Sequence, residues 1–446
     1  MRLPQTPPDA DQLFQKAVEN GRYALFMRLN EIGAQSQSIY LHWDELRFKP
    51  PPEGLSPQDW WLLLKLWRRS QVQMVPLRAA GGRSFGWVQW HKITEALHRI
   101  DVGLGGTMQT PEAVTHPEMR DRYLIRSLSE EAITSSLLEG AVVTREVAKQ
   151  LIRTRRPARD KSERMILNNY LTMRKIRDLQ KEEITPSRVL ELHRMITDET
   201  LDDPKAAGRL RKEDERIRVV NEEGTVFHDP PPAGELKERM KMMCAFANGK
   251  TPDGFLHPAL RAIILHFWLA YDHPFVDGNG RMARALFYWS MLRSGYWLCE
   301  FISISHVILK APVQYYKAFL HAETDDNDVT YFIVHQLDVV LRATEDLHQY
   351  IKHQTQRMNA LRSRLSGVDV LNHRQRALVE HALGHPDSEY TIDAHQASHD
   401  VVYQTARSDL LDLAKRGLLH KYKVGRVMHF RPAKDLDEKL AGEAVE

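Results

Sequence analysis

The densest group of chemically useful side chains in this sequence lies between His273 and Arg284. His273 carries the one side chain whose ordinary pKa lies near working pH, so it can take a proton from a hydroxyl. Asp277 offers a hard oxygen ligand of the kind that Mg²⁺ prefers. Arg281 and Arg284 are three residues apart, on one face of a helix, where both can neutralise a polyphosphate. These residue types together predict chemistry on a nucleoside triphosphate.

Two helices and a glycine-rich turn must position these side chains. Apolar residues recur at helical spacing from 256 to 271, and Pro274 favours a helix end at His273. The helical pattern resumes at 282 and runs to a stop at 295. Between the helices, the backbone amides of Gly278, Asn279 and Gly280 can converge at a helix N-terminus. This turn is therefore predicted to hold phosphate.

The segment resembles the signature HPFx[DE]GNGRxxR of the Fic family at every fixed position. The resemblance implies transfer of AMP from ATP to a Ser, Thr or Tyr hydroxyl of a protein target or of the enzyme itself. His273 would be the base, and Asp277 would carry Mg²⁺. The phosphates would be held by the following residues: Gly278, Asn279, Gly280, Arg281 and Arg284.

A second motif lies upstream, from Ser135 to Gly140, and matches the pattern [S/T]xxxE[G/N]. It resembles the self-inhibition motif of many Fic proteins, on the N-terminal side of the catalytic block. The resemblance implies that Glu139 pairs with Arg284 and so occupies the cation meant for the γ-phosphate. The alternative is a solvated glutamate before a glycine that ends a helix.

Residues 216–220 and 225–228 are expected to form two short strands around a polar turn at 221–224. The hairpin resembles the flap with which Fic proteins hold the target backbone, and the candidate contacts are Ile217, Val219 and Val226. The alternative is a surface hairpin without a function.

Two further segments resemble the family. The run from Gly208 to Arg211 is similar to its G-x-x-R turn, and Tyr315-Tyr316 is similar to its tyrosine pair after the signature. Ala311 stands where the family pattern has asparagine, and this departure bears on adenine recognition.

The length of 446 residues and the changes in composition predict three domains in a mainly α-helical protein. We expect an N-terminal, helical Fic-associated extension at 1–110, ended by a glycine-rich loop at 103–110. A Fic-type helical bundle with the flap and the inhibitory helix should follow at 111–350. A winged helix-turn-helix is expected at 365–435.

Three helices near 370–383, 391–397 and 401–413, followed by a hairpin near 424–430, predict the winged helix. Such a domain could bind DNA through Gln404, Arg407 and Arg426, or it could dock a protein. The net charge of +3 favours neither, and we slightly prefer protein contact or homodimerisation.

Composition excludes several other classes. The sequence has two cysteines, Cys244 and Cys299, which argues against a disulfide framework and fits a reducing compartment. No signal peptide and no apolar run of about 18 residues is present, so we expect a soluble, cytoplasmic protein without membrane contact. A P-loop motif is also missing.

Two alternatives remain open at this point. The same fold could move another group, such as UMP, phosphate or phosphocholine. A DNA-binding regulator could instead use its Fic block only to sense nucleotide. The intact Gly-Asn-Gly-Arg run favours a nucleoside triphosphate with AMP left on the target.

Overall fold

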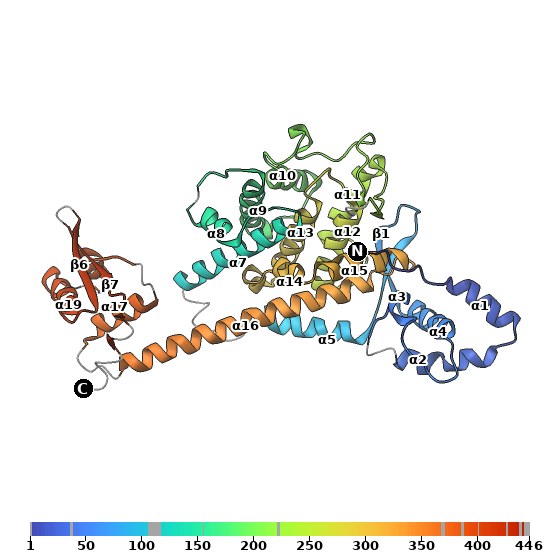
Figure 1. Cartoon of the computed structure of the whole chain (residues 1–446), viewed down its shortest axis with the longest axis horizontal. Coiled ribbons are helices and arrows are strands. Elements are labelled where there is room, and N and C mark those ends of the chain that lie inside the picture. Colours follow the sequence, from blue (N-terminus) through green and yellow to red (C-terminus); the bar gives the residue numbers. More distant parts are fainter. Residues whose placement is uncertain are drawn as a thin grey trace. The chain divides into compact units, whose positions relative to one another are not determined.

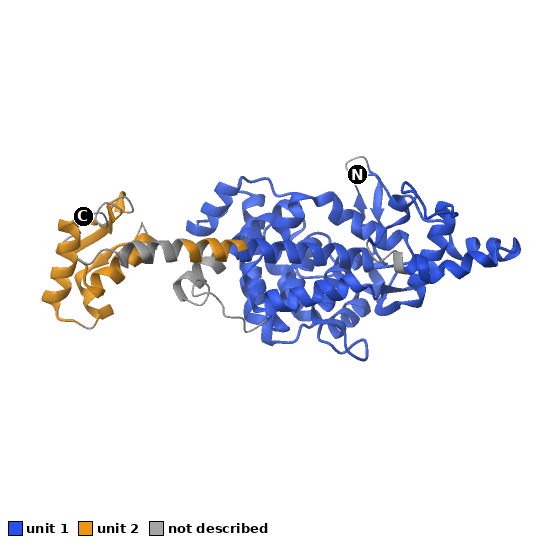
Figure 2. Ribbon diagram, turned by 90° about the horizontal axis from the view of Figure 1, so that it is seen from below, with its two compact units in different colours: residues 1–110, 114–348 blue, residues 111–113, 349–446 orange. Residues whose placement is uncertain are grey.

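The computed structural model describes residues 2–35, 39–105, 117–154, 156–220, 224–366, 371–384, 388–399, 401–424, 427–436 and 439–440. Over these residues the protein is mainly helical, with three small sheets, which confirms the predicted fold class. The chain divides into two compact units (Figure 2). The first holds Met1–Thr110 and Val114–His348, and the second holds Pro111–Ala113 and Gln349–Glu446.

Within the described ranges, the N-terminal part of the first unit contains five α-helices and a hairpin. The helices are α1 (Ala10–Glu19), α2 (Leu29–Gln35), α3 (Trp43–Leu46), α4 (Pro57–Ser70) and α5 (His91–Ile100). Strands β1 (Val72–Arg78) and β2 (Ser84–Val88) pair antiparallel. A capping box of Ser56 and Asp59 starts α4, and Trp61 on this helix is fully buried. The glycine-rich segment predicted as a loop begins instead as a π-helical turn at Asp101–Gly105, and residues 106–110 lie outside the described ranges.

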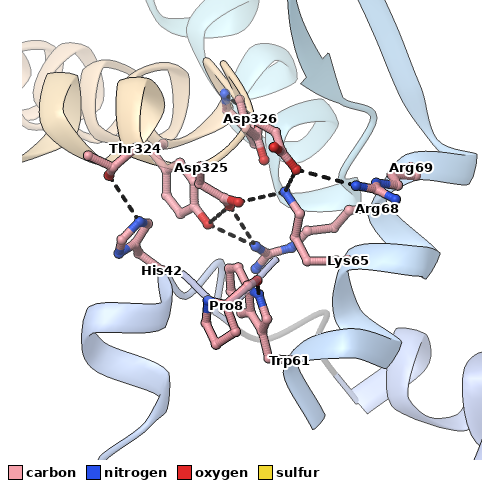
Figure 3. Close-up of polar contacts among 12 residues, drawn as sticks. Pro8, His42, Trp61, Lys65, Arg68, Arg69, Thr324, Asp325 and Asp326 are labelled. Atoms are coloured by element: carbon pink, nitrogen blue, oxygen red, sulfur yellow. Dashed lines mark hydrogen bonds and ion pairs between the residues drawn. The ribbon is translucent and has the colours of Figure 1, made fainter. Parts of the chain in front are cut away.

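A buried polar network connects α4 to the start of α16 (Thr330–Ser366) within this unit (Figure 3). The Lys65 Nζ lies 2.6 Å from Asp325 Oδ1, and the two side chains are 6% and 2% exposed. Arg68 donates through Nη1 to the Tyr331 hydroxyl at 2.8 Å. The N-terminal segment is thereby attached to the part of the chain that follows α15 (Pro312–Thr324).

The rest of the first unit forms a helical block in which α12 (Pro258–Asp272) packs against α13 (Asn279–Arg293) (Figure 1). Most side chains of both helices are buried: α12 is apolar on nearly all of its faces, and α13 buries Arg281 and Arg284 together with its apolar residues. The other helices are α7 (Pro117–Leu138), α8 (Arg145–Thr154), α9 (Lys161–Asp178), α10 (Pro186–Ile196), α11 (Leu236–Ala247) and α14 (Ile304–Lys310). A two-stranded sheet joins β3 (Val219–Val220) and β4 (Val226–His228).

The second unit contains α17 (His373–Gly384), α18 (Ile392–His399) and α19 (Tyr403–Lys415). Its sheet has the order β5-β7-β6, formed by Tyr390–Thr391, Val427–Pro432 and Leu419–Val424 respectively. The helices and the hairpin follow the order that the sequence predicts, around a separate apolar core that includes Val379, Leu410 and Phe430. Arg426, a predicted DNA contact, lies outside the described residues. No helix in the described ranges is both long and apolar enough to span a bilayer.

Candidate functional site

His273 follows the last residue of α12 and caps this helix in a left-handed conformation, with φ 44° and ψ 55°. Its N–H donates to the Leu269 carbonyl at 3.0 Å, so the last helical turn is closed before the chain leaves at Pro274. A non-glycine residue rarely adopts a positive φ, and such backbone strain is concentrated at functional sites. The half-buried imidazole consequently faces a cavity at the end of the helix.

One hydrogen bond defines the tautomer of the His273 ring. Its Nδ1 lies 3.3 Å from the carbonyl oxygen of Ala270. Because a carbonyl can only accept, Nδ1 carries the proton and Nε2 keeps a free electron pair. Burial lowers the pKa of His273 to about 4, and the nearby charge of His228 acts in the same direction. The ring is therefore neutral at pH 7.

Arg211, the arginine of the G-x-x-R turn, holds the backbone around His273. Its Nε donates to the His273 carbonyl at 2.9 Å, and its backbone N–H donates to the Pro274 carbonyl at 2.9 Å. Its Nη2 donates to the Pro231 carbonyl, at the end of the β3–β4 hairpin. The sequence contained the motif, but it did not place this arginine among the site residues.

In the turn between α12 and α13, the backbone at position 278 has a conformation that only glycine adopts easily. Gly278 has φ 85°, and an added Cβ would lie 2.9 Å from Thr197 Cγ2. Asn279 Nδ2 donates to the Phe275 carbonyl at 2.9 Å, and Asn279 Oδ1 accepts from the Phe275 N–H at 3.0 Å. The Asn279 side chain thus stabilises the turn. Helix α13 begins at Asn279, and its first backbone N–H groups have no hydrogen-bond partner within the helix.

Asp277 stands at the open side of the turn, with 43% of its side chain exposed. Its Oδ1 accepts from the Gly278 N–H at 2.5 Å, and its Oδ2 lies 3.4 Å from Arg281 Nη2. His193 supports the backbone of Asp277. The His193 Nδ1 accepts a hydrogen bond from the Gly208 N–H, so the ring proton is on Nε2. This Nε2 donates to the Asp277 carbonyl at 2.9 Å. No sequence pattern had pointed to His193.

Arg281 is fully buried, and its Nη1 donates to the Ile196 carbonyl at 3.0 Å. Within the described part of the chain, its Nε has no hydrogen-bond partner. Burial lowers the pKa of Arg281, and Asp277 opposes this effect. A buried cation with an unused donor is suited to an anionic ligand, because an unmade hydrogen bond is costly.

Arg284 is also buried, and it contacts the motif at the end of α7. Its Nε donates to Ser135 Oγ at 2.8 Å, and its Nη2 donates to the Ser135 carbonyl at 3.1 Å and to Glu139 Oε1 at 2.8 Å. The two residues expected to pair are thus in direct contact. Glu139 follows the last residue of α7, and Gly140, with φ 87°, turns the chain away.

Some of the sequence-predicted residues line a cavity of about 700 Å³, whereas Ser135, Asp277, Gly278, Arg281 and Arg284 are not among its lining residues. His273, Asn279 and Gly280 line it together with Glu139 and Val219. The remaining lining residues are Val220, Phe227, His228, Ala270, Tyr271, Tyr315, Tyr316, Phe319, Leu320 and Glu323. His228 was predicted only as a strand residue of the hairpin, and Glu323 belongs to no motif, so neither was identified as a site residue.

The strand predicted at 216–220 is shorter in the structure, where β3 contains only Val219 and Val220. Ile217 lies before β3, since its N–H is used in a turn to the Glu215 carbonyl. Val226 pairs with Val220 in the hairpin but does not line the cavity. Residues 221–223 of the predicted turn lie outside the described ranges.

Of the tyrosine pair, Tyr315 lies in the core and Tyr316 lies at the rim of the cavity. Tyr315 is buried, with its hydroxyl 2.9 Å from His266 Nε2. Tyr316 is 39% exposed, and its hydroxyl lies 3.5 Å from the Leu138 carbonyl at the end of α7. Ala311 precedes α15 and is not among the residues that line the cavity.

Residues 183–291, which contain His273, the turn and both arginines, match the Fic/DOC family. The protein adenylyltransferase Fic of Drosophila melanogaster is 30% identical over 254 residues, which cover 54% of this chain and 48% of that protein. The same enzyme of Drosophila virilis is 31% identical over 226 residues, which cover 48% and 43% respectively. The chain thus spans less than half the length of these relatives.

A solved structure shares the fold. A Fic family protein from Desulfovibrio desulfuricans G20 has a TM-score of 0.52 at 20% sequence identity, covering 77% of this chain and 96% of that one. Residues 183–291, around His273 and its glycine-rich turn, are therefore similar to the Fic/DOC family, and the fold resembles that of a solved Fic family protein.

Proposed function

We propose that this protein is an adenylyltransferase that moves AMP from ATP to a Ser, Thr or Tyr hydroxyl of a protein or of itself. The observation that carries the proposal is the position of the His273 ring. It has a free Nε2 and lies on the same cavity as the N-terminus of α13. A base beside an anion site is what attack of a hydroxyl on a phosphorus requires.

In the proposed reaction, His273 Nε2 takes the proton of the target hydroxyl. The hydroxyl oxygen then forms a bond with the α-phosphorus of ATP. The bond between that phosphorus and the bridging oxygen breaks, and pyrophosphate leaves with its electron pair. The left-handed cap at His273 and the Arg211 hydrogen bond hold the ring in place, so positioning supplies much of the rate.

The turn and α13 supply the charge that ATP requires. The backbone N–H groups of Asn279 and Gly280 begin the helix, where the macrodipole favours phosphate, and the Gly278 N–H before them donates to Asp277. Arg281 offers its unused Nε, and Arg284 offers its guanidinium once Glu139 has left it. The two buried cations would thus divide the negative charge of the triphosphate between them.

The turn also fits a magnesium ion. The described residues contain no cluster of three or more His, Cys, Asp or Glu side chains that could enclose a metal. A half-exposed single carboxylate, Asp277, is nevertheless what Mg²⁺ uses when it binds mainly water and phosphate oxygens. Bound there, the ion would neutralise phosphate charge.

We further propose that Glu139 inhibits the enzyme. Its carboxylate accepts from Arg284 and lies against Gly280, so it occupies the charge and the space that the terminal phosphates need. ATP would then bind in a pose unsuited to in-line attack. Ser135 supports the inhibited state, because its hydroxyl and carbonyl hold Arg284 in this orientation.

The test is to incubate the purified chain with α-labelled and, separately, γ-labelled ATP. Label from the α-position alone supports AMP transfer. Label from the γ-position alone would replace the proposal with phosphate transfer on the same fold, and label from UTP but not ATP would replace AMP by UMP.

For the second unit we propose protein docking, including homodimerisation, rather than DNA binding. Val402 and Tyr403 at the start of α19 are 68% and 49% exposed, and Val424 and Val427 beside the hairpin tip are also exposed. Apolar side chains favour protein contact over phosphate contact. A salt-dependent shift of labelled duplex DNA by the full chain would contradict this assignment.

A further inference from the structure

The inference concerns His228, the last residue of β4, which is 8% exposed and lines the same cavity as His273. Its Nδ1 lies 2.7 Å from Glu323 Oε2 on α15. Its Nε2 lies 2.6 Å from the Tyr271 carbonyl oxygen in the last turn of α12. An ionised carboxylate and a carbonyl can only accept hydrogen bonds, so both ring nitrogens have to donate. A neutral imidazole has only one N–H.

The surroundings of His228 favour a positive charge. The Tyr271 carbonyl belongs to the last turn of α12, where the helix carries partial negative charge. Glu323 supplies the negative charge in contact with the ring, and the charge of Asp229 acts in the same direction. Burial acts against the charge, but these groups together raise the pKa of His228.

Other titratable groups near the ring do not cancel this effect. Asp272 at the end of α12 is engaged by Arg239 of α11, at 2.7 Å, and by the Trp268 indole N–H at 3.0 Å. His273 is neutral at pH 7, because burial lowers its pKa to about 4. Arg211 donates to the carbonyl oxygens of His273 and Pro231.

We infer that His228 is a doubly protonated imidazolium that clamps strand β4 to the end of α12 and to α15. The clamp makes His228 a positioning residue, because it holds the β3–β4 hairpin beside His273 where a target backbone would have to lie. This role in positioning rests on the proposed AMP transfer, whereas the charge of the ring and the attachment of the hairpin do not.

The clamp has a defined pH dependence. A group whose pKa is raised in the folded state gives its stabilisation at low pH and loses it as the pH rises through that pKa. The hairpin is therefore fastened while the His228 ring is protonated, and it is released as the pH rises through the raised pKa of His228. Glu323→Gln keeps an acceptor but removes the charge, so the release should move to lower pH.

The first experiment records long-range ¹H–¹⁵N spectra of the histidine rings in the full chain, with the His228 signals assigned by their loss in His228→Gln. Two protonated ring nitrogens at pH 7 are expected. One unprotonated nitrogen at pH 7 would overturn the inference. This measurement does not depend on AMP transfer.

The second experiment compares hydrogen exchange of the amides at 226–228. Exchange should accelerate about ten- to a hundredfold in His228→Gln, because hydrogen bonds to a charged group are lost. His429→Gln is the matched control, since it removes an imidazole 3.3 Å from the Glu389 carboxylate in the second unit. Equal exchange in His228→Gln and the control would contradict the clamp.

The third experiment measures labelling from α-labelled ATP in a Glu139→Gly background. His228→Gln should slow labelling about ten- to a hundredfold without changing ATP affinity, and Glu323→Gln should shift the basic limb of the pH profile to lower pH. Labelling at the parental rate in His228→Gln would overturn the positioning role. If the Glu139→Gly parent itself shows no labelling, the proposed function fails. The ring spectra and the exchange rates then still test whether His228 holds the hairpin.

Discussion

Gly280 and Glu139 approach so closely that a Cβ added to Gly280 would lie 2.0 Å from Glu139 Oε1. The carboxylate thus lies against the first turn of α13, where a helix N-terminus attracts anions. The same oxygen accepts a hydrogen bond from Arg284 at 2.8 Å. Glu139 therefore occupies the space beside the α13 backbone and pairs with the Arg284 cation, both of which a polyphosphate would need.

Removal of this carboxylate should increase activity. We expect Glu139→Gly to raise auto-labelling from α-labelled ATP about 5- to 150-fold, the range of a typical coupling energy. The gain should disappear when Arg284→Ala is added, because the released arginine is then missing, and the two changes should be strongly non-additive. Glu146→Gly, on the exposed start of α8, is the control and should leave labelling unchanged. No gain in Glu139→Gly over a range of Mg²⁺ and ATP concentrations would rule out self-inhibition through this residue.

Replacement of the base should separate catalysis from binding. His273→Ala in the Glu139→Gly background should lower the labelling rate about 10²–10⁴-fold, the usual contribution of a general base. ATP affinity, measured by calorimetry, should change little, because the ring acts on the attacking hydroxyl. A large loss of ATP affinity with an unchanged labelling rate would assign His273 to nucleotide binding.

The pH profile should reflect the lowered pKa of His273. The base must be neutral to accept a proton, so activity is lost as the pH falls through its pKa of about 4. We expect kcat/KM of Glu139→Gly to be flat on the acid side between pH 5 and 7, with folding checked by circular dichroism. An acid limb centred near the ordinary histidine pKa, about 6.5, would contradict the lowered pKa of His273.

Asp277 should control the metal requirement. Asp277→Ala should shift the Mg²⁺ titration of labelling to higher concentrations, because the ion would lose its protein ligand. The variant also frees Arg281 from its 3.4 Å contact, so ATP binding without Mg²⁺ should be measured beside it. Superimposable Mg²⁺ titrations of the variant and the parent would remove Asp277 from the metal site.

The network between α4 and α16 should be important for stability. Asp325→Ala removes the carboxylate closest to the buried Lys65 and Arg68, and breaking a buried ion pair by removing one partner costs about 3–5 kcal/mol. Urea unfolding followed by tryptophan fluorescence should show this loss, since Trp61 and Trp268 are buried in the first unit. Asp338→Ala, which breaks the exposed pair with Arg342, is the control and should cost less than about 1 kcal/mol. Equal losses in the two variants would contradict a special role of the network.

The sequence by itself determined the local architecture of the site. The hydrophobic period around Leu260 and Leu286 predicts two helices, and Pro274 and Gly278 define the turn between them; the structure contains α12, this turn and α13. These features depend on backbone preferences and on side chains within a few positions of each other. Such local constraints can be read directly from residue types and spacing.

Only the tertiary structure decided which distant side chains meet. The contact of Arg284 with Glu139 spans 145 positions, and that of Lys65 with Asp325 spans 260. The first was implied by resemblance to a known motif, while the second, like the two acceptors around His228, had no signal in the sequence. A side chain's hydrogen-bond partners, and hence its charge, depend on how helices and strands pack. Packing is a property of the whole core, and no local spacing specifies it.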